Sequence, residues 1–253
     1  MINNRTPCVG VLLRAILAAS LLVLLFFYQA LGHEMIDAER AGIYLKRIRE
    51  HNAAMAHGRS VEQRAEAHFA LGETVARIVE FLNRDLTSHH GELGLANTMI
   101  VHELKAQGIE LTMWPEAMRY KSYVKPFERY VALLPEGPRR AEALFRIFQG
   151  RFYDSFIYDP LQPIDLDWLD LVVRIKQEEA FLERYPDFRN REEVHFILAA
   201  DYVRAARQAL GANSRMTYAA RAQVMLQEFL TAYPNSLRAT AAQMLLESLP
   251  SIE

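Results

Sequence analysis

Cysteine is almost absent from this chain of 253 residues, in which Cys8 is the only one. From residue 9 onward this absence excludes disulfides, thiolate metal sites and c-type haem attachment. Cys8 also precedes the apolar part of the N-terminus, whereas a lipoprotein signal needs its cysteine after that part. Lipid attachment is therefore not expected.

The chain also lacks an excess of charge of one sign and the short motifs of common enzymes. It has 29 Lys and Arg against 31 Asp and Glu, without a basic block or tail, which argues against nucleic acid as a partner. The 11 glycines are dispersed, so no glycine-rich phosphate loop is present, and neither G-x-S-x-G nor H-E-x-x-H occurs. We therefore expect a protein that is not an enzyme and that has no cofactor.

A long apolar segment is present only at the N-terminus. Arg5 and Arg14 precede a stretch, residues 15–28, that is apolar except for Ser20, and the small-residue pattern Ala-Leu-Gly follows at 30–32. A positive start, a short apolar centre and a small-residue exit are typical of a secretory signal. The segment predicts that the rest of the chain is exported, in a bacterium to the periplasm.

Two interpretations of residues 1–32 stay open. Cleavage after Gly32 would release a soluble protein, whereas an uncleaved segment would anchor it in the inner membrane through residues 9–31, which can just span a bilayer. In the second case these residues are the only expected contact with the membrane.

Helical periodicity dominates the remainder, and no segment shows the alternating pattern of a strand. We expect an all-α protein with an N-terminal helical region at 33–110, a connection at 111–126 that contains Pro115 and Pro126, and a C-terminal repeat domain at 127–253. The predicted helices lie near 41–55, 60–82, 93–104, 127–134, 139–152, 166–185, 189–210, 215–233 and 237–248. Ser60 is expected to cap the second of them, with Gln63 three residues later.

The phrase Phe-Leu-x-x-Tyr-Pro occurs at 181–186 and again at 229–234. A third copy ends at Pro135, and in all three an aromatic residue precedes the proline by five positions. Because proline ends a helix and biases its predecessor away from the α conformation, each copy predicts the turn of a helical hairpin. Hairpins that repeat about every 50 residues are expected to stack into a solenoid.

The C-terminal part, roughly residues 123–253, resembles tetratricopeptide repeats (TPRs), most closely those of the periplasmic outer-membrane assembly lipoprotein and cell-division coordinator families. The residues that carry this resemblance are Ala222, Leu226, Phe229, Tyr233, Pro234, Ser236 and Ala242, together with Tyr185, Pro186, Leu198, Ala199 and Tyr202. The resemblance implies stacked antiparallel helical hairpins and a non-catalytic scaffold that binds protein or peptide partners in the cell envelope.

Histidines provide an alternative of another class. Seven of the eight lie before residue 103, and imidazole is the commonest metal ligand, so an envelope protein that binds metal or haem is conceivable. The candidate ligands are His33, His89 and His90. Against this, no pair has the i, i+4 spacing of a helical metal site, His68 lies on an apolar helix face, and His102 is expected to face water.

The segment 152–163 is aromatic and acidic and is broken by two prolines, and it is expected either to pack on its own hairpin or to contact a partner. Its acidic neighbourhood, residues 154–170, lacks the order of a calcium loop, and an acid/base pair there is a further alternative. The residues that we expect to be exposed and to bind a partner are Tyr153, Tyr158, Trp168 and Tyr202.

Overall fold

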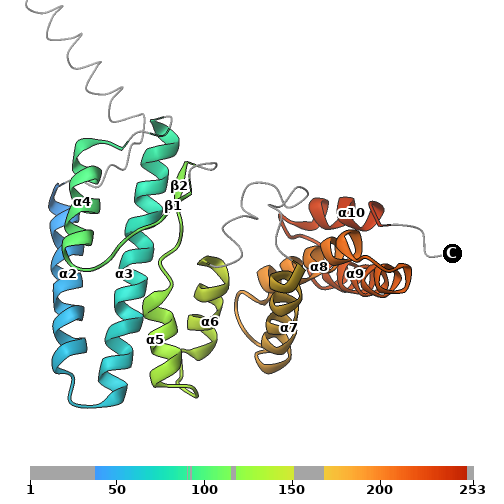
Figure 1. Ribbon diagram of the computed structural model, residues 1–253, viewed down its shortest axis with the longest axis horizontal. Coiled ribbons are helices and arrows are strands. Elements are labelled where there is room, and N and C mark those ends of the chain that lie inside the picture. The colour runs from blue at the N-terminus through green and yellow to red at the C-terminus, as the bar shows by residue number, and fades with distance from the viewer. Residues whose placement is uncertain (1–37, 90, 92, 115–117, 151–167, 250–253) are drawn as a thin grey trace, which may run out of the picture. The chain divides into compact units, whose positions relative to one another are not determined.

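The computed structural model describes residues 38–89, 91, 93–114, 118–150 and 168–249. Within these ranges the chain forms nine helices and one short β-hairpin (Figure 1), which confirms the all-α prediction. None of the helices in these ranges combines the length and the apolar character needed to cross a bilayer. The predicted signal or anchor, residues 1–32, lies outside them.

The helices follow the predicted ranges closely. Their bounds are Ala38–His57 (α2), Val61–Ser88 (α3), Leu95–Ala106 (α4), Lys125–Leu133 (α5), Arg140–Phe148 (α6), Trp168–Arg184 (α7), Arg191–Gln208 (α8), Ala212–Ala232 (α9) and Ala239–Glu247 (α10). The predicted cap of α3 is present, since the backbone N–H of Gln63 donates to Ser60 Oγ at 3.2 Å and the Gln63 side chain accepts from the N–H of Arg59 at 2.9 Å.

The chain forms two compact units. Unit 1 contains the residues up to Arg49 and the segment Ala76–Tyr120, and unit 2 contains Glu50–Val75 and the chain from Lys121 onward. Helices α2 and α3 contribute residues to both.

Unit 1 is a small helical bundle with a β-hairpin that sequence periodicity did not predict. Strands β1 (Met113–Trp114) and β2 (Arg119–Tyr120) are antiparallel and only two residues long, too short for an alternating pattern. The buried Asn83 of α3 holds them: its side-chain amide donates to the carbonyl of Tyr120 at 3.0 Å and accepts from the Tyr120 N–H at 2.7 Å.

Unit 2 contains the three predicted hairpins, α5–α6, α7–α8 and α9–α10, and their turns have the same backbone hydrogen bonds. The residue before each proline is the helix C-cap and donates its N–H to the aromatic residue four positions earlier: Leu134 to Tyr130, Tyr185 to Phe181 and Tyr233 to Phe229, at 2.8–2.9 Å. Two further bonds follow in register in each turn, and the next helix begins six residues after the cap. The predicted role of these prolines as turn markers is confirmed.

The aromatic residue five positions before each proline also joins its hairpin to an earlier helix. Tyr130 packs against Phe69 of α3, with ring centroids 5.4 Å apart, and Phe181 packs against Phe148 of α6 at 5.5 Å. Phe229 packs against Phe196 of α8, also at 5.5 Å. The side chains of Tyr130, Phe181 and Phe229 are at most 3% exposed. Each contact therefore buries an aromatic ring that a single hairpin would leave in water.

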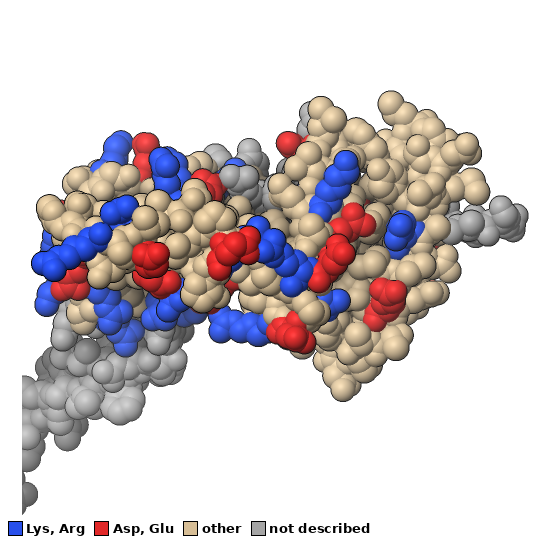
Figure 2. Space-filling model, turned by 90° about the horizontal axis from the view of Figure 1, so that it is seen from below, with Lys and Arg blue, Asp and Glu red and all other residues tan. Residues whose placement is uncertain are grey.

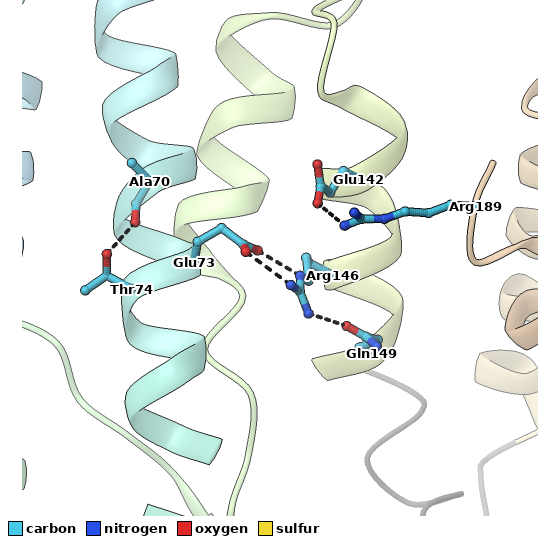
Figure 3. Close-up of polar contacts among 7 residues, drawn as sticks. All are labelled: Ala70, Glu73, Thr74, Glu142, Arg146, Gln149 and Arg189. Atoms are coloured by element: carbon cyan, nitrogen blue, oxygen red, sulfur yellow. Dashed lines mark hydrogen bonds and ion pairs between the residues drawn. The ribbon is translucent and has the colours of Figure 1, made fainter. Parts of the chain in front are cut away.

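Ion pairs also connect each of two hairpins to an earlier helix (Figure 3). Arg146 of α6 binds the carboxylate of Glu73 on α3 through Nε and Nη2, at 2.8 and 3.2 Å, and Arg189 binds Glu142 at 2.7 Å. On the face drawn in Figure 2, acidic and basic side chains lie side by side over much of the surface.

Helix α8 is enclosed on all sides, because α7, α9 and α10 pack against it. Every residue from Val194 to Ala206 is buried, including Leu198 and Tyr202 of the repeat pattern. Apolar residues make up most of this buried stretch, and its buried polar residues are His195, Asp201 and Arg204.

We predict that Phe229→Ala lowers the free energy of unfolding by about 3–5 kcal/mol, because it removes the fully buried ring that joins α9 to α8. Gln227→Ala, on the exposed face of the same helix, should change it by no more than about 0.5 kcal/mol. Urea denaturation followed by far-UV circular dichroism measures both. Equal effects of the two substitutions would contradict the role given to Phe229.

Candidate functional site

An open groove of about 500 Å³ lies in unit 2 between α5, α6 and α7. Its apolar lining comes from all three helices: Val131, Leu144, Ile147, Phe148, Ala180 and Phe181. Its polar lining consists of Glu128, Arg140, Gln177, Arg184 and Tyr185. An apolar cleft with a few polar groups at its edge is the usual form of a ligand site.

The packing of the hairpins produces this groove. Phe148 and Phe181 meet at a ring angle of 68° and hold α6 against α7. Two small side chains, Ala132 on α5 and Ala180 on α7, leave room between the facing helices. Because α7 ends at Arg184 and the chain turns at the next residue, the side chain of Tyr185 also lines the groove.

Two arginines and a tyrosine form the polar part of the groove. Arg140 donates from Nη1 to the hydroxyl of Tyr185, and its guanidinium lies 6.0 Å from the centre of that ring. Arg184 lies 5.9 Å from the same ring and pairs with Glu136. The Nε–H of Arg140 is shielded from water and has no hydrogen-bond acceptor among the described residues. A carboxylate in the groove would pair with the positive charge of the half-buried Arg140 guanidinium, which lines it.

Tyr202 is not exposed, so this part of the predicted partner-binding set is wrong. The residue is 5% exposed, because it lies on the enclosed helix α8, and its hydroxyl donates to the carboxylate of Glu179. Burial raises the pKa of the Tyr202 hydroxyl, and the hydrogen bond to Glu179 adds to the rise. Periodicity places Tyr202 on a helix face but does not show that a neighbouring helix covers it.

Trp168 is half-buried at the start of α7 and packs edge to face against Tyr218 of α9, with ring centroids 5.5 Å apart. Trp168 and Tyr202 do not line the groove. Tyr153 and Tyr158 lie outside the described residues, as does most of the acidic stretch at 154–170. Partner binding by Tyr153, Tyr158 and Trp168 stays a prediction.

Of the three histidine candidates, only His89 lies within the described residues. Nδ1 of His89 lies 2.9 Å from the buried carboxylate of Asp85, which also accepts hydrogen bonds from Gly94 and Asn97. His33 and His90 lie outside the described part of the chain. Among the residues that the structure describes, no group of three or more His, Cys, Asp or Glu is placed to hold a metal ion. His102 is exposed, as expected.

A buried charge cluster between α7 and α8 was missed by the sequence analysis. Arg174 forms a two-bond pair with Asp201, and the same carboxylate lies 3.6 Å from Nη1 of Arg204. Glu178, one helical turn after Arg174, completes a set of two cations and two carboxyl groups that are at most 6% exposed. Burial raises the pKa of Asp201, and the adjacent Arg174 guanidinium opposes that rise. The available signal was charge at packing positions, since Arg174 and Glu178 alternate with Leu171, Ile175 and Leu182 on one helix face.

The arginines of the groove were also missed. Arg140 follows Pro135 by five residues, and from the sequence alone it is expected to be an ordinary solvent-exposed residue at the start of a helix. Only the approach of α7 shows that it reaches Tyr185, which is 45 residues away.

Comparisons with known proteins do not assign the chain to a family. No protein-family model matches it, and no curated protein is similar to it at a significant level.

His195 gives the contact between α8 and α9 a titratable group. It is 6% exposed and lies edge to face against Phe229 and Tyr233, with ring centroids 5.8 and 6.0 Å apart. Burial lowers the pKa of His195, while Glu228, whose carboxylate lies 4.0 Å from Nε2, raises it and Arg191 lowers it further. The folded state therefore favours the neutral imidazole.

We predict that the protein loses stability as the pH falls below about 6.5, the ordinary pKa of histidine, toward the lowered pKa of His195 in the folded state. In this interval the unfolded chain binds the proton more readily than the folded one. His195→Gln should reduce the pH dependence of the melting temperature, and the half-buried His68, whose pKa burial also lowers, should account for part of the remainder. His102→Gln is the exposed control, and an identical pH profile for His195→Gln and the wild type would contradict the prediction.

Proposed function

We propose that the protein is a non-catalytic scaffold of the cell envelope, which binds protein or peptide segments in the groove formed by α5, α6 and α7. The observation that carries the proposal is the composition of this groove: an apolar lining beside the guanidinium groups of Arg140 and Arg184. A groove of this size accommodates a few side chains of an extended or helical segment.

The proposal includes a TPR-like solenoid of antiparallel hairpins. Its support is the agreement of the three turns, each with the same hydrogen bonds and each with a buried aromatic residue against an earlier helix. Together with the sequence resemblance at 123–253, this regularity favours an architecture whose usual work is protein binding.

The groove favours a partner segment with a bulky apolar side chain next to a carboxylate. The apolar side chain would enter between Ala132 and Ala180 and cover Leu144 and Phe148. The carboxylate would accept from Arg140 and approach Arg184, both of which already lie at the ring of Tyr185. Residues 1–32 support export as a signal or anchor, so we place the partner in the envelope.

We predict that peptides selected from a random displayed library by the full-length protein are enriched in a bulky apolar residue beside Asp or Glu. Arg140→Gln should weaken binding of a selected peptide by about tenfold or more, because a hydrogen bond to a charged group contributes about 1.5–3 kcal/mol. Ala180→Glu should abolish binding, because it fills the groove and repels the carboxylate. Fluorescence polarisation with a labelled peptide measures both changes.

Matched controls lie on α9, away from the groove: Arg215→Gln and Ala220→Glu, both at exposed positions. They should leave peptide affinity unchanged, and circular dichroism melts should show that all four variants are folded. A library without enrichment, or equal losses in the groove and control variants, would reject the groove as the binding site.

A further inference from the structure

Three helix ends meet at one end of unit 1. Tyr44 of α2 lies against Phe81 of α3, with ring centroids 6.1 Å apart, so the start of α2 is level with the last turn of α3. The backbone N–H of Gly94, just before α4, donates to the Asp85 carboxylate at 2.9 Å and places the start of α4 beside the same turn. Figure 1 shows the three ends together, and α2 begins here at Ala38.

Large apolar side chains are exposed at this end. Leu95 is 79%, Met99 60% and Met118 54% exposed. A Cβ added to Gly91 would lie 2.8 Å from Met118 Sδ, which places Met118 beside the connection between α3 and α4. Leu95 and Met99 do not contribute to the hydrophobic core, because α4 packs into the core with its opposite face, through Ile100 and Leu104. We call Leu95, Met99 and Met118 the apolar end of unit 1.

The outward surface becomes polar with distance from this end. On α4 the outward residues after Met99 include His102 and Glu103, and on α2 the exposed Ile43 is followed by the exposed Lys46 and Arg47. Leu95 and Met99 cover about 6 Å of helix axis. This length matches the depth of about 5–10 Å to which interfacial helices enter a bilayer.

We propose that residues 9–31 remain in the membrane as an uncleaved anchor and that the apolar end of unit 1 lies on the lipid surface of that membrane. Six residues separate Leu31 from Ala38, so the tether is at most about 25 Å long and keeps this end at the bilayer. Lipid is the occupant that the tether brings within reach without a further partner. The inference rests on the export proposed above but not on the peptide groove, and it selects the anchor from the two interpretations of residues 1–32.

The test uses the full-length chain in vesicles of equal parts phosphatidylethanolamine and phosphatidylglycerol. Cys8→Ser removes the only cysteine, and Met99→Cys or Leu95→Cys then accepts an environment-sensitive fluorophore. Ala106→Cys is the matched control, because it is exposed on the same face of α4 about 10 Å farther along the axis from Met99. We expect spin-labelled lipids to quench the label at 95 and 99 at least twofold more than the label at 106.

Equal quenching at 99 and 106 would overturn the proposed orientation. A label at 99 that is shielded from aqueous quenchers but not reached by lipid spin labels would indicate a protein contact or a second copy of this chain, and would also overturn it. Intact mass of the protein isolated from membranes tests the anchor separately, because a chain beginning at His33 excludes retention. Neither arm involves the groove, so failure here leaves peptide binding to be judged by its own experiment.

Discussion

The contact between the aromatic residue before each turn and an earlier helix is the interaction on which unit 2 depends. Tyr130, Phe181 and Phe229 each accept the capping N–H of their own turn through the backbone carbonyl and place their ring against an earlier helix. One residue therefore couples local chain reversal to long-range packing. Because proline ends the helix one position after the cap, the ring is held at a constant distance from the turn in all three hairpins.

Charge is distributed between helices in two different ways. Pairs such as Arg146–Glu73 and Arg189–Glu142 are partly exposed and contribute little stability individually. Between α7 and α8, Arg174 and Asp201 are fully buried, so removing either partner would leave an uncompensated charge away from water. The buried pair ties α7, which lines the groove, to the enclosed helix α8, and so limits how far this wall can move.

Sequence reasoning was most accurate where one residue type has one structural consequence. Proline after an aromatic residue predicted three turns, and Ser60 with Gln63 predicted a cap, because both effects are local. It failed for Tyr202, for the Arg174–Asp201 pair and for Arg140, whose environments are created by residues that are 23 to 45 positions away. The two-residue strands could not be predicted from the sequence for a related reason, since the side chain of Asn83, far away in the sequence on α3, holds them in place.

The sequence by itself determined the helical class and the position of the turns, and it indicated an N-terminal segment of high hydrophobicity. These follow from periodicity, proline geometry and hydrophobicity, which act over a few residues. Only the tertiary structure decided which faces remain open: the groove at α5, α6 and α7, the enclosure of α8 and the apolar end of unit 1. The physical reason is that exposure depends on which helix packs against which, and one helix of this chain offers several apolar faces that neighbours can cover or leave to solvent.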